Sequence, residues 1–203
     1  MSAYYWIGER LWLDAVNSEF MSDGQRTDGW RDPAALQEWL HETVKRHEEA
    51  ESLRDFSLGN DGEVLLQEAK KLRAALRRAC ETAHREPTSQ TVAPEAVEAV
   101  NAALKHRGVA LQVERGEGGW QEREVGSGEN SDALWLLARS AAHSWTHGEL
   151  VRLKPCSNPN CILWFLDTSK NGTRRWCSMD ACGNRHKVAA HHQRRKQSQG
   201  VGS

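Results

Sequence analysis

Four of the five cysteines form two evenly spaced pairs near the end of the chain. Cys156 and Cys161 make one C-x4-C pair, Cys177 and Cys182 make the other, and fifteen residues separate the pairs. Thiolate sulfur binds Zn²⁺ strongly, and two such pairs with a hairpin-length spacer are typical of a tetrahedral four-cysteine site. Because four protein ligands leave no position for an activated water, the spacing predicts a structural zinc ion rather than a catalytic one.

Other uses of these thiols fit the sequence less well. A redox pair usually has C-x-x-C spacing, and a nucleophilic cysteine needs a base partner rather than three matching thiols. His186, His191 and His192 lie beyond a ligand set that is already complete, so we assign them to the surface of the following helix. Cys80 lies beside the apolar stripe of another helix and is expected to be a buried, unreactive thiol.

The spacer between the two pairs is expected to form a β-hairpin. Residues 162–167 and 174–176 are strand-like, and Asn171–Gly172 is a strong signal for a tight turn between them. Such a hairpin would bring the two pairs of cysteines together. Zinc would then supply folding free energy that a core of only about fifty residues lacks.

The segment that holds these cysteines is basic, whereas the rest of the chain is acidic. Residues 150–203 contain ten Lys and Arg and two acidic residues, a net charge of +8, and the remainder carries −9. Four thiolates and one Zn²⁺ leave this segment strongly positive. The asymmetry predicts an anionic partner, for which nucleic acid is the main candidate. The residues expected to contact it are Arg174, Arg175, Arg185, Lys187, Arg194, Arg195 and Lys196.

From Asp180 onward the sequence has helical character. At 100° per residue, Arg185, His192 and Arg195 share one side of this helix. A basic helix fits the major groove of DNA, where Lys and Arg neutralise phosphates and Arg reaches guanine edges. The alternative is a solvated helix face that only keeps a small domain soluble.

The first 150 residues are predicted to be mainly helical. Apolar periodicity and end signals indicate helices over residues 10–20, 33–47, 63–86, 94–108 and 131–147, with an Asp32 cap before Pro33. Residues 21–29 are expected to be a loop and residues 109–125 a hairpin. In the longest helix, Arg73 and Arg77 are placed on the solvent face, opposite the leucines.

The predicted fold class is therefore mainly α (α+β). A helical N-terminal domain with a small β-hairpin spans residues 1–150. A four-cysteine zinc module of two knuckles, a β-hairpin and a basic helix spans residues 151–197, and residues 198–203 form a flexible tail.

Composition excludes several classes of protein. Charged residues make up 27% and hydrophobic residues 38%, which is typical of a globular protein. No apolar run approaches the roughly 18 to 20 residues of a membrane helix, and the N-terminus shows no secretory signal. We expect a soluble, cytoplasmic protein without disulfides or a membrane partner. The P-loop, HExxH, GxSxG and GxGxxG motifs are absent, so no catalysis is expected.

Several quoted motifs resemble a known family. The segments WFLDTSKN, RRWCSM and CGNR, followed by a basic helix, resemble the CGNR zinc finger over about residues 150–196. The segments LWLDAVNS, WRDPAALQEWL and ALWLLARSAAHSWTHGELVRLKPC are similar to the ABATE domain that accompanies it. The resemblance implies a bacterial, stress-induced transcription regulator with zinc held by the four cysteines, DNA as its target and a nucleoid location. Gly183, Asn184 and Arg185 are the residues after which the finger is named.

A group of polar and aromatic residues in the N-terminal domain is a candidate ligand pocket. Three small polar side chains come from the first helix, and three tryptophans would form walls. Such side chains more often cap helices and pack cores, so a structural role is the stronger interpretation. The group consists of Trp12, Asp14, Asn17, Ser18, Trp30 and Trp39.

The sequence as a whole favours a zinc-stabilised, DNA-binding transcriptional regulator. Its N-terminal domain is a candidate for sensing a small-molecule effector or for assembly into a homo-oligomer. One alternative is an RNA-binding protein in which Trp164 and Trp176 stack on bases. We prefer to place these tryptophans and Phe165 in a miniature core over the metal. The other alternative is a zinc module that docks a protein.

Overall fold

The chain folds into a mainly helical structure, as the sequence predicts. In a computed structural model, residues 4–86, 91–105, 109–116, 119–126 and 130–184 are described. Within these ranges, two short 3₁₀ helices and one π-helical turn supplement the α-helices. The α-helices are α1 (Leu11–Val16), α2 (Pro33–Val44), α3 (Gly62–Arg85), α4 (Pro94–Leu104) and α5 (Asn130–Thr146). The 3₁₀ helices are η1 (Glu48–Leu53) and η2 (Glu149–Arg152), and the π-helical turn is η3 (Met179–Gly183).

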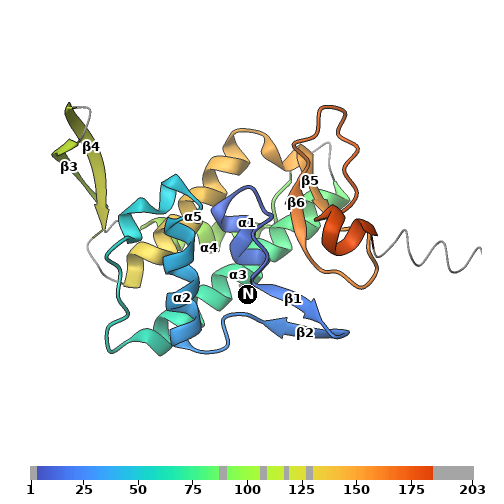
Figure 1. Cartoon of the computed structure of the whole chain (residues 1–203), viewed down its shortest axis with the longest axis horizontal. Coiled ribbons are helices and arrows are strands. Elements are labelled where there is room, and N and C mark those ends of the chain that lie inside the picture. The colour runs from blue at the N-terminus through green and yellow to red at the C-terminus, as the bar shows by residue number, and fades with distance from the viewer. Residues whose placement is uncertain (1–3, 87–90, 106–108, 117–118, 127–129, 185–203) are drawn as a thin grey trace, which may run out of the picture.

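The strands within the described ranges pair as antiparallel hairpins of two strands each. None of these small sheets is joined to another. The strands are β1 (Glu19–Ser22) with β2 (Gln25–Asp28), β3 (Val109–Gly116) with β4 (Gly119–Gly126), and β5 (Leu153–Pro155) with β6 (Trp164–Leu166). Figure 1 shows the helices packed together, with β3 and β4 extending from one end and the cysteine segment at the other. The β3–β4 pairing confirms the hairpin predicted over residues 109–125.

Two of the helices show clearly why their sequences fold as they do. The α2 helix begins at Pro33, and the Asp32 carboxylate accepts a 2.7 Å hydrogen bond from Ala35 N, which confirms the predicted cap. Along α3, leucine and alanine recur every three or four residues, and this stripe is buried against the other helices. Within the described residues, no helix has both the length and the apolar character needed to cross a bilayer.

Residues 19–28 differ from the prediction. The first helix ends at Val16 instead of continuing to Phe20, and the expected loop is the β1–β2 hairpin. Asp23 and Gly24 both have positive φ, at 51° and 79°, which is the conformation of a tight two-residue turn. The Asp-Gly pair was therefore a hairpin signal that the sequence interpretation missed.

The arginines of α3 are the second correction. Arg73 is only 3% exposed and Arg77 only 9%, although both were placed on the solvent face. They are buried because the β1–β2 hairpin supplies carboxylates and carbonyl groups to them. A smaller correction applies to α4, which was predicted from apolar periodicity: Val97, one of its apolar residues, is 39% exposed.

The cysteine segment also pairs differently from the prediction. Strand β6 pairs with β5, which precedes the first cysteine, and not with residues 174–176. The turn at Asn171–Gly172 is present, with a positive φ of 62° at Gly172. After this turn, Arg174 N donates to the Asp167 carboxylate at 3.0 Å. This bond to a side chain replaces the backbone bond that the predicted strand pairing would have formed.

Candidate metal centre

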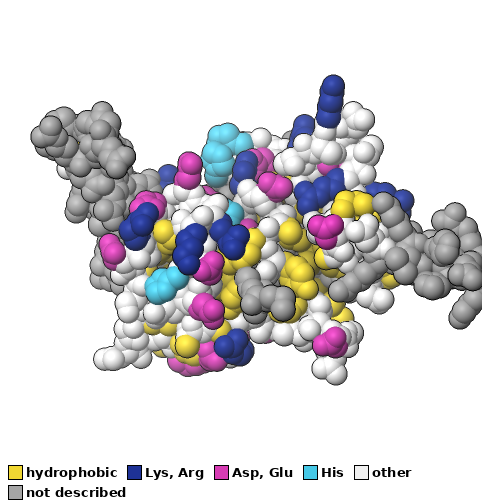
Figure 2. Space-filling view, viewed as in Figure 1, with side chains coloured by type: hydrophobic (Ala, Val, Ile, Leu, Met, Phe, Trp, Pro, Cys, Tyr) yellow, Lys and Arg dark blue, Asp and Glu magenta, His cyan; other side chains and the backbone are white. Residues whose placement is uncertain are grey.

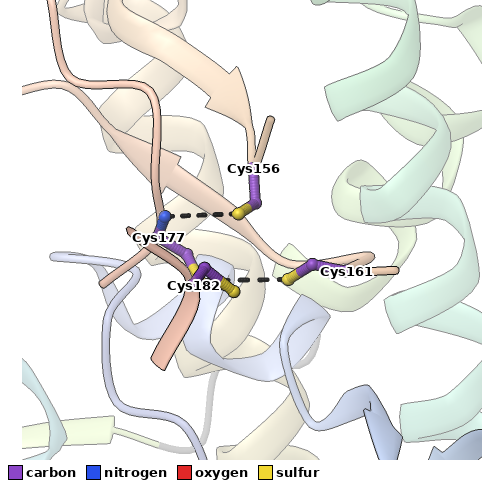
Figure 3. A group of neighbouring side chains, drawn as sticks. All are labelled: Cys156, Cys161, Cys177 and Cys182. Carbon is purple, nitrogen blue, oxygen red and sulfur yellow. Dashed lines mark hydrogen bonds between the residues drawn. The ribbon is translucent and has the colours of Figure 1, made fainter. Parts of the chain in front are cut away.

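The four predicted cysteines meet at one point (Figure 3). Their Sγ atoms all lie within 4.8 Å of one another. The Sγ of Cys177 lies 3.9 Å from that of Cys161 and 3.6 Å from that of Cys182. A tetrahedral zinc site with Zn–S bonds of about 2.3 Å requires sulfur atoms about 3.8 Å apart. The arrangement therefore fits a structural Zn²⁺ ion, and the predicted cofactor is confirmed.

Short local turns hold the ligands in place. Cys156 N donates to Leu163 O at 2.9 Å across the β5–β6 end, and Cys161 N donates to Asn158 O at 2.9 Å. Cys182 lies in η3, where its own N–H donates to Ser178 O at 3.0 Å. Each cysteine pair thus closes a compact loop that points its sulfur atoms toward the same centre.

The four cysteines can all be ionised together only if a cation balances the negative charge of their sulfur atoms. Hydrogen bonds from the thiols of Cys161 and Cys177 lower the pKa of Cys156 to about 2. The same interactions raise the pKa of Cys161 to about 12 and raise that of Cys177 as well. Two N–H donors also favour the thiolate form: Cys177 N donates to Cys156 Sγ at 3.5 Å, and Asn158 Nδ2 donates to Cys182 Sγ at 3.4 Å. A bound Zn²⁺ allows all four to ionise together.

An apolar layer surrounds the sulfur atoms. Phe165 is fully buried and packs with three of the cysteines and with Leu163. Trp164 is 7% exposed and belongs to the main core of the helical body, and Trp176 packs at the edge of the sulfur cluster. The preferred prediction, a miniature core over the metal, fits Phe165 and Trp176, whereas Trp164 is buried in the main core of the helical body instead.

The helical body also contributes to the metal centre. Phe20 of β1 is buried in the same cluster as the cysteines, and Ile7 packs against it. Asn17 forms two hydrogen bonds with Trp164: its Nδ2 donates to Trp164 O at 2.8 Å, and its Oδ1 accepts from Trp164 N at 2.9 Å. Arg77 donates to Ile162 O at 3.0 Å. The two parts of the chain therefore form one folded unit.

We expect Asn17→Ala to destabilise the chain by about 2 to 4 kcal/mol, because it leaves the N–H and the C=O of Trp164 buried without a partner. Urea denaturation followed by tryptophan fluorescence measures this loss. Asn160→Ala is the matched control, since Asn160 is exposed, and its effect is expected to stay within about 0.5 kcal/mol. Equal stability of the two variants would contradict this account of Asn17.

The candidate pocket residues are all buried and interact with the protein itself. Asp14 accepts hydrogen bonds from Ile7 N at 3.0 Å and Gly8 N at 2.6 Å and contacts His47 at 2.9 Å. Other polar groups of the set bond to Ser144, to Ala15 O and to Trp164. The stronger, structural interpretation accounts for these contacts. The set is Trp12, Asp14, Asn17, Ser18, Trp30 and Trp39.

Only part of the predicted nucleic-acid surface lies in the described residues. The Arg174 guanidinium lies 4.4 Å from the centre of the Phe165 ring and donates to the carbonyl groups of Trp176 and Cys177. Arg175 is exposed beside Trp176. The remaining predicted contacts and the three histidines lie outside the described residues, as does the tail at 198–203. They are Arg185, Lys187, Arg194, Arg195, Lys196, His186, His191 and His192.

One buried residue near the metal, Asp167, was not singled out from the sequence. Asp167 is 1% exposed, and its carboxylate accepts hydrogen bonds from Lys154 Nζ, Ser169 and Arg174 N. Burial alone would raise the pKa of Asp167, but the hydrogen bonds from Lys154 and Ser169 outweigh burial and hold it well below its usual range. A carboxylate directly after a strand that is buried throughout was the available signal.

Gly183 has a packing role. A Cβ at this position would lie 2.7 Å from the Met179 sulfur and 3.3 Å from Trp176 Cδ1. In the structure, the space beside it is filled by side chains of the ligand loop.

Two family models match the chain and together cover most of it. The ABATE model, described as "Putative stress-induced transcription regulator", matches residues 9–148. The model described as "CGNR zinc finger" matches residues 152–195, which include all four cysteines. A search among curated proteins gives no match.

Proposed function

The chain belongs to the ABATE family, whose model is described as "Putative stress-induced transcription regulator", and carries a CGNR zinc finger. From that premise we propose that it regulates transcription by binding duplex DNA. Both matched families are regulator or zinc-finger families rather than enzyme families. The proposal divides the chain into a regulator domain at residues 1–150 and a zinc finger at residues 151–197. It places the protein in the cytoplasm, at the nucleoid.

The observation that carries the proposal is that the metal centre lies within the basic segment of the chain. Residues 150–203 have a net charge of +8 before the zinc site is counted. Figure 2 shows Lys and Arg side chains along the exposed edge of the finger, whereas both signs of charge are mixed over the body. Cys182 precedes Arg185 by three residues, so zinc fixes the point from which the basic segment starts. Clustered cations bind phosphate backbones through counterion release.

We expect the zinc-loaded protein to bind a mixed-sequence duplex with affinity that falls steeply as salt rises. If about four basic side chains contact phosphates, the slope of log affinity against log salt should be about −3 to −4. Fluorescence anisotropy with a labelled duplex measures this slope. A flat dependence would favour a protein-docking module instead.

The variant Arg194→Ala/Arg195→Ala separates two kinds of contact. Weaker binding to all duplexes indicates that these arginines contact phosphates, and a loss confined to one sequence indicates that they read bases. Competition by single-stranded RNA that exceeds competition by duplex DNA would favour the RNA-binding alternative.

Effector sensing and homo-oligomer formation by residues 1–150 belong to the proposal as the means by which DNA binding is regulated.

A further inference from the structure

An open groove of about 610 Å³ lies between the helical body and the zinc finger. It is lined by His84 at the C-terminal end of α3, by Val151 and residues 153–157 around β5, and by residues 172–175 after the turn. We call it the α3–finger groove. Because α3 packs against β5, its two sides come from regions that match different family models.

The lining of the α3–finger groove is basic. None of the eleven residues that line it is acidic. Two carboxylates lie beside the groove: Asp167 pairs with Lys154 at 2.6 Å, and Glu9 lies 3.6 Å from the Arg174 guanidinium. Among the described residues, Arg175 is the lining cation that has no acidic partner. The groove therefore favours an anionic ligand. Its cationic members are Lys154, Arg174 and Arg175, and His84 adds an imidazole ring.

Several polar groups in the groove have donors to spare. Within the ranges that the structure describes, the guanidinium of Arg175 and the hydroxyls of Ser157 and Thr173 have no hydrogen-bond partner. Arginine, lysine, serine and threonine side chains are among the groups that bond DNA phosphates. The groove presents this combination of donors along one continuous surface.

The loop that carries these donors is held in place before any ligand binds. Lys154 Nζ donates to Asp167 Oδ2 at 2.6 Å and to Gly172 O at 2.5 Å. Arg174 N donates to the same carboxylate at 3.0 Å. Residues 172–175 are thus tied to β5 on one side of the groove. A preformed site loses less conformational entropy on binding than a loop that must first become ordered.

His84 brings the helical body into this surface. Its ring is exposed and meets the Trp164 ring edge-to-face, with centroids 5.8 Å apart. Among the described residues, its ring nitrogens have no hydrogen-bond partner. A backbone phosphate in the groove would lie within the region bounded by His84 and the finger residues.

We propose that the α3–finger groove binds the phosphate backbone of duplex DNA, so that the ABATE domain and the zinc finger contact the DNA together. The inference rests on the proposed DNA-binding function. It adds that the finger is not the whole DNA-binding surface, and that a residue of the N-terminal domain, His84, is a positioning contact for one strand.

The test compares four variants of the full-length, zinc-loaded chain on a labelled mixed-sequence duplex. Arg175→Ala is expected to weaken binding about tenfold and to reduce the magnitude of the salt slope by about 1. His84→Glu is expected to weaken binding at least tenfold, because it places negative charge in the groove. Thr173→Val, which keeps the shape of the side chain, should weaken binding about threefold. Zinc content is measured for every variant.

Val64→Glu is the matched control for His84→Glu. It makes the same change in net charge at an exposed position of α3. The two positions are twenty residues apart on the helix, about 30 Å, which exceeds the Debye length of about 10 Å at 0.1 M salt. We expect Val64→Glu to bind within twofold of wild type.

The outcomes separate the groove from the broader function. If the wild-type protein binds DNA and Arg175→Ala, Thr173→Val and His84→Glu all bind equally well, the groove proposal is overturned and the proposed function stands. If the wild-type protein binds no duplex even at low salt, the proposed function itself fails. Stronger competition by single-stranded RNA than by duplex DNA also overturns the proposal. Should a charge change reduce zinc content, Thr173→Val decides.

Discussion

Cys177→Ser is expected to remove zinc from the protein and to destabilise the helical body as well as the finger. Cys177 lies 3.6 and 3.9 Å from two of the other sulfur atoms, and a serine hydroxyl is a poor substitute for a thiolate ligand. The body is affected because Trp164 and Leu166 of β6 belong to its main core. Loss of the metal would therefore expose apolar surface on both sides of the contact.

The expected size of the effect is large. Structural zinc contributes about 10 to 16 kcal/mol to the folding of isolated zinc-finger peptides, which is comparable with the total stability of a typical domain. We expect metal analysis to find about one zinc ion per chain in the wild type and close to none in the variant. Thermal unfolding should shift to lower temperature for the α-helical signal, and not only for the finger.

Cys80→Ala is the matched control for the loss of a thiol. Cys80 is fully buried on α3, and burial raises its pKa, so it is an unreactive core residue, as the sequence predicts. Its replacement should cost about 1 kcal/mol and leave zinc content unchanged. Full zinc occupancy in Cys177→Ser, or a helical body whose unfolding is unaffected by zinc loss, would contradict the shared core.

Arg73→Ala is expected to destabilise the chain by about 3 to 5 kcal/mol. The Arg73 guanidinium donates to both carboxylate oxygens of Asp28, at 2.7 and 2.8 Å, and to Ser18 Oγ at 2.7 Å. Its charged carbon also lies 4.7 Å from the centre of the Trp30 ring. The variant removes a side chain that is only 3% exposed and leaves Lys70, 3.2 Å from Asp28 Oδ2, as the main cationic partner of that carboxylate. Such a loss is more costly than losing a surface ion pair.

Two comparisons test this prediction for Arg73. Arg78→Ala removes an exposed arginine from the same helix and should change the free energy of unfolding by less than about 0.5 kcal/mol. The effect should also depend on pH. Burial alone would raise the pKa of Asp28, but hydrogen bonds from Arg73 outweigh it and lower the pKa. The stabilisation is thus present above the unfolded pKa of about 3.9 and is lost as pH falls below it.

Urea denaturation of wild type, Arg73→Ala and Arg78→Ala at pH 7 and in acid measures both the loss of stability and its dependence on pH. We expect the difference between wild type and Arg73→Ala to become smaller as Asp28 is protonated. Similar losses for the two arginine variants at pH 7 would show that the Asp28 pair contributes no more than a surface contact.

The features that the sequence predicted well depend on residues close together along the chain. The spacing of the four cysteines indicated one metal site, and the structure brings their sulfur atoms together. The stripe of leucine and alanine on α3 follows the period of a helix, and the Asp32 cap contacts a residue only three positions away. In each case the local pattern itself contains the physical requirement.

The features that the sequence interpretation missed depend on partners far away in the chain. Periodicity assigns an arginine to the solvent face because it is charged, and it does not show that Asp28, 45 residues earlier, will neutralise Arg73 in the core. Strand β6 was given the wrong partner because three-residue strands carry little register information. The contact of Asn17 with Trp164 joins residues 147 positions apart.

The sequence by itself determined that this chain binds zinc through four cysteines and that a basic segment follows the metal. Those properties follow from ligand chemistry and charge, which residue types and their spacing express directly. Only the tertiary structure decided that the metal site rests on the helical body, that two α3 arginines lie inside the protein, and that His84 borders the basic groove. Those outcomes depend on which surfaces pack together, because burial and hydrogen-bond partners change the behaviour of the same side chain.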